Sequence, residues 1–323
     1  MKKGAFYIIF LLFLFTFSSD RQSLSIFKRL TSLRYLIYVP DNYANDSISK
    51  WPVLLFLHGS GERGNDLLKV NENGPPKLIK EGRKLPFIVI SPQLGYTQFW
   101  DPDLLVNLIK KVSNEYRVDD ERVYLTGLSM GGFGTWYTAM KYPQMFAAIA
   151  PVCGGGNPKR LWKIRHLPVW IFHGAKDHVV SLSRSVEMAT GLLPYKNARF
   201  TIYPDADHDS WTETYNNEAL YKWFLEHKRF RFTEDTVQVN LENFTGEYSS
   251  GKDFADIIVK NKKLVIRFSG LESGEMLMYH SKESSFYFDE NSLKEIKYVL
   301  DQNGKMTSFI FYNDTPKAYF RVR

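Results

Sequence analysis

The chain has 323 residues, and its 42 Lys and Arg exceed its 35 Asp and Glu, which gives a net charge of +7. Hydrophobic residues make up 44% and charged residues 24%, so the composition excludes a mainly disordered chain. A length of one domain per roughly 100–200 residues favours two domains. The single cysteine, Cys153, excludes an internal disulfide and a cysteine-based zinc or iron–sulfur site. Basic residues are scattered, and the densest group, Lys228, Arg229 and Arg231, is too short for a nucleic-acid interface.

The first 19 residues have the pattern of a secretory signal peptide. Lys2 and Lys3 precede the apolar run Ala5–Phe17, and Ser18 and Ser19 follow it at a possible cleavage site. The run is short for a membrane-spanning helix, which needs ~20 apolar residues. An uncleaved anchor is the alternative, because no A-x-A site is present. The pattern favours export to the periplasm or the medium, with no lipid-modified cysteine and no membrane span after cleavage.

From about Ser32 to Arg229, short apolar runs alternate with helix-like stretches. Such runs suit strands that are buried on both faces of a parallel sheet. They are Val53–Leu57, Phe87–Ile90, Val123–Leu125, Ala147–Val152, Val169–Phe172 and the weaker Arg199–Tyr203. The helix-like stretches are Leu104–Tyr116, Phe133–Lys141, Ser185–Leu193 and Glu218–Glu226. The alternation predicts a doubly wound, mostly parallel α/β domain over residues 20–231.

The pattern changes after Arg231, where short segments with partial alternation begin. Asn303–Gly304 predicts a two-residue hairpin turn between Tyr298–Leu300 and Thr307–Phe311. The other candidate strands are Phe254–Lys260, Lys263–Phe268, Glu275–His280 and Ser308–Tyr312. Residues 236–323 are therefore expected to form a small antiparallel β domain, either a barrel or a sandwich.

The most specific motif is Gly127–Gly131, with the sequence GLSMG. It lies between a predicted strand and the predicted helix Phe133–Lys141, which is the setting of the G-x-S-x-G turn. Glycines permit the tight turn, and the helix directs its first amides toward a developing negative charge. A phosphate-binding loop is the alternative, but the chain has no G-K-[ST] at this place. Ser129 is therefore the predicted nucleophile.

A serine hydroxyl needs a base and an orienting carboxylate, which follow it in the order Asp or Glu, then His. Of the seven histidines, position leaves His208, in a polar loop after the Arg199–Tyr203 run. Asp177 follows the preceding strand and is the preferred acid, which would fix the imidazole tautomer and stabilise imidazolium. The alternative acids close to the histidine are Asp205, Asp207 and Asp209.

An oxyanion hole needs two backbone N–H groups that point at the developing charge. The residue after the nucleophile, Met130, is expected to supply one of them. The glycine-rich turn His58–Gly64 follows the Val53–Leu57 run, and Ser60 is the preferred second donor. A flexible loop without a catalytic role is the alternative for this turn.

Three tryptophans are candidates for lining a substrate cleft. No inserted lid is evident between Cys153 and Pro168, which favours an open cleft. Trp100, Trp162 and Trp211 each lie near a predicted loop at the catalytic edge of the sheet. Ordinary core packing is the alternative for each of them.

Together these motifs resemble those of the α/β-hydrolase superfamily over residues 32–229. Closest are the extracellular esterases and predicted peptidases of the polyhydroxybutyrate-depolymerase, feruloyl-esterase and dienelactone-hydrolase-like groups. The segments that carry the resemblance are Leu57–Asp66, Ser91–Gln93, Gly127–Gly132, His173–Asp177 and His208–Trp211. It implies a Ser129–Asp177–His208 triad and ester hydrolysis without a metal or organic cofactor. Around Phe244–Tyr248, the C-terminal part is similar to small lipocalin-like β domains of some exported serine hydrolases.

The leading interpretation is an exported serine carboxylesterase that forms an acyl-enzyme. Its substrate would be a small ester or an acyl or feruloyl ester of a polysaccharide. A serine peptidase of the prolyl-oligopeptidase-like type is the alternative, because amide cleavage uses the same three groups. A non-catalytic polysaccharide-binding protein is suggested by the 15% aromatic content. Such a protein has no need of a serine, an acid and a base together.

Overall fold

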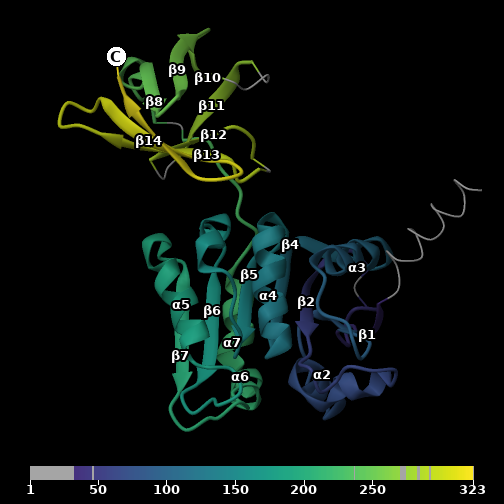
Figure 1. Ribbon diagram of the computed structural model, residues 1–323. Coiled ribbons are helices and arrows are strands. Elements are labelled where there is room, and N and C mark those ends of the chain that lie inside the picture. Colours follow the sequence, from purple (N-terminus) through teal and green to yellow (C-terminus); the bar gives the residue numbers. More distant parts are fainter. Residues whose placement is uncertain are drawn as a thin grey trace, which may run out of the picture. The chain divides into compact units, whose positions relative to one another are not determined.

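The computed structural model describes residues 33–45, 47–235, 237–269, 274–281, 284–290 and 292–322. The expected signal peptide, residues 1–19, lies outside these ranges. Two compact units divide the chain, Met1–Arg229 and Phe230–Arg323 (Figure 1). Within the described ranges, no helix has the length and apolar character needed to span a membrane.

A seven-stranded sheet forms the centre of the first unit, in the order β1-β3-β2-β4-β5-β6-β7. Neighbouring strands are parallel, except that β1 runs antiparallel to β3 at the edge. This confirms the predicted mostly parallel α/β sheet. The strands are β1 Arg34–Tyr38, β2 Trp51–Leu57, β3 Ile88–Gln93, β4 Val118–Leu128, β5 Ala148–Val152, β6 Val169–Gly174 and β7 Ala198–Tyr203.

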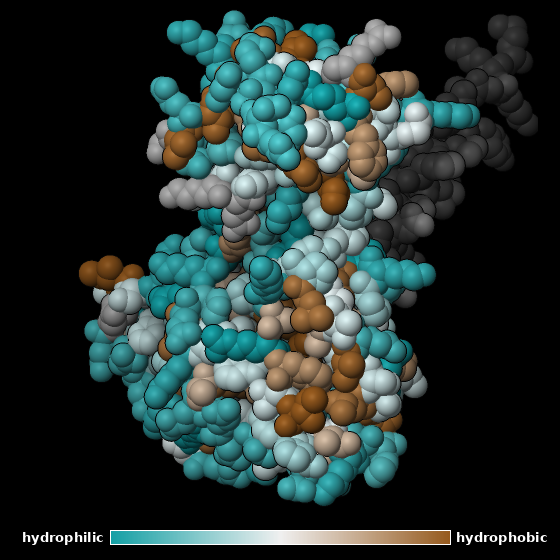
Figure 2. Space-filling model, turned by 90° about the vertical axis from the view of Figure 1, so that its left-hand side faces the viewer, coloured by the Kyte–Doolittle hydropathy of each residue, from teal (hydrophilic) through white to brown (hydrophobic). Residues whose placement is uncertain are grey.

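Helices cover both faces of this sheet (Figure 1). In β2, Val53, Leu55 and Leu57 belong to one buried cluster and Leu54 and Phe56 to the other, because alternate side chains point to opposite faces. The first cluster packs under α3 Pro102–Glu115, α4 Met130–Lys141 and α5 Ser183–Leu192. The second packs under α2 Gly74–Lys80, α6 Trp211–Asn216 and α7 Glu218–Glu226. The molecular surface seen in Figure 2 is mostly hydrophilic, and its hydrophobic side chains form smaller groups.

All four predicted helices are present, with ends within three residues of the prediction. In the first unit, the sequence analysis missed β1, α2 and α6. β1 contains the short apolar run Tyr35–Tyr38, which was not singled out, and is a half-buried edge strand; α2 is short and begins with Gly74, Pro75 and Pro76. Proline is acceptable at the first helical positions, where its missing N–H has no partner in the helix. The 3₁₀ helices are η1 Leu67–Glu72, η2 Pro143–Met145, η3 Pro158–Ile164, η4 Leu193–Tyr195 and, in the second unit, η5 Leu241–Asn243.

The second unit is a closed barrel of antiparallel strands, in the order β10-β11-β12-β13-β14-β15-β8-β9. Aromatic side chains such as Tyr248, Phe286 and Phe309 fill much of its interior, as eight strands allow. A pocket of about 530 Å³ has both apolar and polar walls, such as Met278 and His280. The strands are β8 Gly246–Ser250, β9 Asp253–Lys260, β10 Lys263–Phe268, β11 Met276–Ser281, β12 Ser285–Tyr287, β13 Glu295–Leu300, β14 Met306–Tyr312 and β15 Lys317–Arg321.

The hairpin between β13 and β14 lies where Asn303–Gly304 predicted it, but the predicted two-residue turn is wrong. Pairing ends at Leu300 opposite Met306, so the loop spans residues 301–305. The Asp301 carboxylate accepts the N–H groups of Asn303 and Lys305 at 2.8 and 2.9 Å. This side chain satisfies donors inside the loop and so stabilises a longer connection.

A chain that ends at Arg231 tests whether the first unit folds alone. Each unit has buried clusters of its own, so the shortened chain is expected to unfold cooperatively. Its Tm should be close to the Tm of the first unit within the complete chain. Thermal unfolding followed by circular dichroism measures this. Aggregation of the shortened chain at equal concentration would contradict the prediction.

Candidate active site

Ser129 occupies a sharp turn between β4 and α4. Its φ of 52° and ψ of −116° lie outside the regions that residues with a side chain favour. A Cβ atom on Gly131 would lie 2.0 Å from the Leu57 carbonyl oxygen, and one on Gly127 would lie 2.5 Å from the Gly131 carbonyl oxygen. Both positions therefore require glycine. The turn places the Ser129 hydroxyl at the carboxyl end of a central strand.

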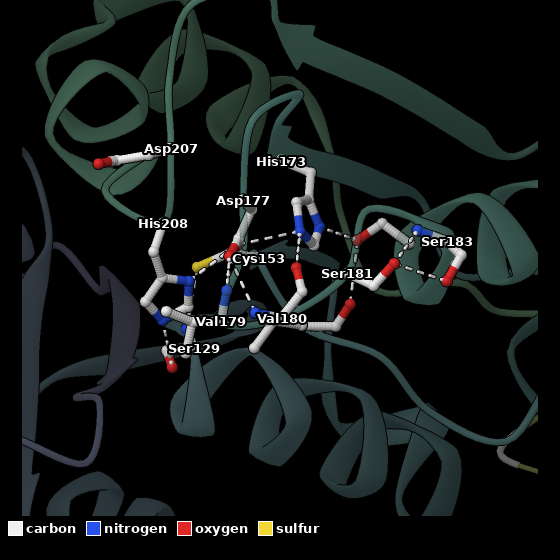
Figure 3. A network of polar contacts seen from close by, with 12 residues as sticks. Ser129, Cys153, His173, Asp177, Val179, Val180, Ser181, Ser183, Asp207 and His208 are labelled. Atoms are coloured by element: carbon white, nitrogen blue, oxygen red, sulfur yellow. Dashed lines mark hydrogen bonds and ion pairs between the residues drawn. The ribbon is translucent and has the colours of Figure 1, made fainter.

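His208 connects Ser129 with Asp177 through two hydrogen bonds (Figure 3). The His208 Nδ1 atom lies 2.8 Å from Asp177 Oδ2, and His208 Nε2 lies 3.0 Å from Ser129 Oγ. Because a carboxylate only accepts, Nδ1 carries the proton, and Nε2 is left to accept the serine hydroxyl. The acid follows β6 and the histidine follows β7. The structure thus brings together the three residues that the sequence analysis selected, whereas the side chain of Asp207 points elsewhere (Figure 3).

The Asp177 carboxylate is buried and receives several donors. Its Oδ1 atom accepts the N–H groups of Val179 and Val180, each at 2.8 Å. Burial acts to raise the pKa of this carboxyl, but the hydrogen bonds from His208, Val180 and Val179 outweigh burial and lower the pKa. Asp177 is therefore ionised, and its charge can stabilise a protonated His208.

A second imidazole, that of His173 at the end of β6, also contacts Asp177. The His173 Nε2 atom lies 3.2 Å from Asp177 Oδ2 and 2.8 Å from the Val180 carbonyl oxygen, which fixes a proton on Nε2. Its Nδ1 atom lies 2.7 Å from Ser185 Oγ. Figure 3 shows the carboxylate between the two imidazoles. The sequence analysis assigned no role to His173, and its place four residues before Asp177 was the available signal.

Cys153 lies beside this group and is fully buried. Burial raises the pKa of its thiol to about 12, so the sulfur is neutral, and Sγ accepts the Ser129 N–H at 3.3 Å. Potential metal-ligating atoms of Cys153, Asp177 and His208 lie within 4.8 Å of one another. However, a metal takes up thiolate rather than thiol, and the imidazole and carboxylate already bond to each other. We assign the cluster to the hydrogen-bond network.

The two predicted oxyanion donors follow the ends of the neighbouring strands β2 and β4. Met130 is the first residue of α4, so its N–H has no acceptor within the helix. Ser60 is exposed and follows β2, which pairs with β4 up to Leu57 opposite Gly127. A Cβ atom on Gly59 would lie 2.7 Å from the Leu128 side chain, so the turn that holds Ser60 is in close contact with the end of β4.

His58 connects the turn that holds Ser60 to Leu94, the residue after β3. The Leu94 N–H donates to His58 Nε2 at 3.1 Å, so the other nitrogen, Nδ1, carries the proton and donates to the Gly59 carbonyl oxygen. The Trp100 indole donates to the His58 carbonyl oxygen at 3.2 Å. Burial lowers the pKa of His58 to about 4, which keeps the ring neutral.

An aromatic pocket of about 440 Å³ opens beside Ser129. Of the three candidate tryptophans, Trp100 lines this pocket. Trp162 lies in η3 and Trp211 at the start of α6, and neither is among the lining residues. The residues that line the pocket together with Ser129 are Phe99, Trp100, Met130, Phe133, Gly134 and Tyr137.

Comparison with known proteins agrees with this architecture. A family model described as a putative esterase matches residues 78–193. A thermostable esterase of known structure is 30% identical, with a TM-score of 0.53 over 61% of this chain and 60% of that one. The first unit has the α/β-hydrolase fold.

The curated relatives that match the first unit are esterases by name, and the matched part differs in its share of each. A bifunctional acetylxylan esterase/xylanase of Neocallimastix patriciarum is 31% identical in an alignment of 199 residues that covers 58% of this chain and 27% of that protein. A probable feruloyl esterase C of Aspergillus terreus is 24% identical over 175 residues, 50% of this chain and 61% of that protein. The chain therefore spans about a quarter of the first relative and three fifths of the second.

The pH dependence of stability tests the neutral state of His58. Its pKa is about 4 in the folded chain and near 6.5 when unfolded, so the unfolded chain binds this proton first as the pH falls. The contribution of neutral His58 to the free energy of unfolding is therefore complete above pH 6.5 and is lost as the pH falls to 4. These two pKa values correspond to a loss of about 3 kcal/mol in the free energy of unfolding. The unfolding free energy of His58→Gln should fall less steeply over this window than that of the unaltered chain. Urea unfolding at each pH measures both; parallel curves would refute the prediction.

Proposed function

We propose that the first unit hydrolyses carboxylic esters through Ser129, His208 and Asp177. The observation that carries the proposal is the continuous hydrogen-bonded chain, with 3.0 Å between serine and imidazole and 2.8 Å between imidazole and carboxylate. This is the arrangement that activates a serine hydroxyl. The esterase names of the relatives support an ester as the bond that is cleaved.

In the proposed reaction, Ser129 Oγ attacks the acyl carbon while His208 Nε2 takes the hydroxyl proton. Asp177 stabilises the imidazolium, and the backbone N–H groups of Met130 and Ser60 donate to the oxyanion. The alcohol departs with the proton from Nε2, which leaves an acyl-enzyme. Water then attacks the acyl carbon by the same route, with His208 again as base, and releases the acid.

We propose that the acyl group binds in the aromatic pocket and that the alcohol belongs to a polysaccharide. The pocket walls favour a flat, apolar group such as feruloyl, and an acetyl group also fits. At its rim, Phe99 is 73% and Tyr137 48% exposed, which leaves room for a polymer. The acetylxylan and feruloyl esters in the relatives' names support this substrate class.

We also propose that the protein is exported, on the basis of the basic, apolar and small residues at positions 2–19. N-terminal sequencing of the protein from the periplasm or the medium tests this. A chain recovered only from the cytoplasm, with Lys2 and Lys3 present, would refute export.

Replacing Ser129 with alanine removes only the attacking oxygen. We expect kcat on p-nitrophenyl acetate to fall by ~10⁴-fold or more, with the fold retained. A fluorophosphonate should label the unaltered chain at Ser129 and fail to label Ser129→Ala. Ser181→Ala, at an exposed serine, is the matched control and should label normally. EDTA should leave the rate unchanged, because no proposed step uses a metal.

The aromatic pocket is tested by Phe99→Ala and Tyr137→Ala. Each removes ring surface at the rim, so KM for methyl ferulate is expected to rise several-fold, while p-nitrophenyl acetate is turned over almost as before. Tyr96→Ala is the control, because Tyr96 is 65% exposed and does not line the pocket. Equal effects of all three variants on methyl ferulate would contradict the assignment.

A further inference from the structure

A chain of polar contacts runs from the glycine-rich turn to the ring of His208 without passing through Asp177. The Asn73 Nδ2 group donates to Glu62 Oε1 at 2.7 Å. The Trp211 indole N–H donates to Asn73 Oδ1 at 3.0 Å. The Trp211 ring then meets the His208 imidazole edge to face, at 90° and 5.2 Å between centroids.

The side-chain amide of Asn73, in the middle of this series of contacts, can have only one orientation. An indole N–H only donates and a carboxylate only accepts, so the amide oxygen must face Trp211 and the amide nitrogen must face Glu62. Asparagine is a favoured helix N-cap, and Asn73 stands at the N-cap of α2. Its side chain makes no capping hydrogen bond there. The amide therefore bonds to Glu62 and Trp211 and does not cap its own helix.

Glu62 is the end of this series of contacts and lies in the same turn as Ser60. The residue is 3% exposed, and the Gln93 amide donates to its carbonyl oxygen at 2.9 Å. Burial raises the pKa of the carboxyl, against hydrogen bonds from Asn73 and from the backbone N–H groups of Glu62 and Gly59. A buried carboxyl is unfavourable unless its partners are fixed. Here those partners include the backbone next to Ser60.

Trp211 supplies the constraint on His208 that Asp177 does not. Asp177 holds one nitrogen of the imidazole, about which the ring can still tilt. The indole ring limits this tilt by contact, and its hydrogen bond to Asn73 keeps the indole itself from turning. Ser129 Oγ then meets Nε2 in a fixed direction.

We propose that Glu62, Asn73 and Trp211 are positioning residues that align His208 with Ser129 and couple this alignment to the turn of Ser60. The inference rests on the proposed esterase function. It gives Trp211 a role in orienting the base rather than in binding substrate. Loss of any link is expected to lower kcat and to leave KM nearly unchanged, because the substrate pocket does not include these side chains.

A double-mutant cycle with Trp211→Phe and Asn73→Ala tests this coupling. Trp211→Phe keeps an aromatic ring but removes the N–H, and we expect kcat on p-nitrophenyl acetate to fall roughly three- to tenfold, the size of typical coupling energies. Asn73→Ala should have a similar effect. The double variant should be no slower than the slower single variant, because both changes break the same chain. Trp223→Phe, in α7 and 3% exposed, is the control that alters core packing without touching the chain.

Three results would overturn the inference: full kcat in Trp211→Phe, additive losses in the double variant, or a rise in KM with unchanged kcat. Trp211→Phe decides the matter alone if Asn73→Ala fails to fold by circular dichroism. Failure of the proposed function looks different. In that case the unaltered chain neither turns over p-nitrophenyl acetate nor reacts with a fluorophosphonate at Ser129.

Discussion

The close approach of α4 to β2 is the constraint on which the candidate site depends. With 2.0 Å between the Leu57 carbonyl oxygen and a hypothetical Cβ on Gly131, only glycine allows the helix to start where it does. That start forces Ser129 into its unusual backbone conformation and brings its hydroxyl to the edge of the sheet. The neighbouring strands β6 and β7 end at the same edge, so the loops that follow them carry the acid and the base to the serine.

A buried carboxylate next to an imidazole is stable only if its donors are in place before any reaction. Asp177 has the N–H groups of Val179 and Val180 and the two histidines around it. These fixed dipoles compensate for lost water, and so the carboxyl stays ionised in spite of burial. Val179 and Val180 come immediately after the acid, His173 ends the strand before it, and His208 comes from the loop after β7. Three of the four donors therefore lie within four residues of Asp177 in the sequence.

The sequence predicted the parallel strands β2 to β7 of the central sheet and the meeting of Ser129, Asp177 and His208, because chain order and parallel topology constrain both. It did not reveal the partners that other loops supply. Asn73 and Trp211 are 138 positions apart, and no local pattern links them. The three-residue strand β12 is too short to alternate visibly, and the Asp301 carboxylate changed the turn before β14. Periodicity reports burial along one element, whereas hydrogen-bond partners depend on how distant elements pack.

Burial favours the neutral form of Asp177, Cys153 and His58, yet these groups end in different protonation states. It keeps the Cys153 thiol protonated and the His58 imidazole neutral, with pKa values of about 12 and about 4. Asp177 differs because four donors surround it, whereas the thiol has only weak partners. The neutral thiol is a poor nucleophile and a poor metal ligand, so it does not compete with the serine. The imidazole between Ser129 and Asp177 consequently faces one full negative charge, and that charge is placed to stabilise the proton it takes from the hydroxyl.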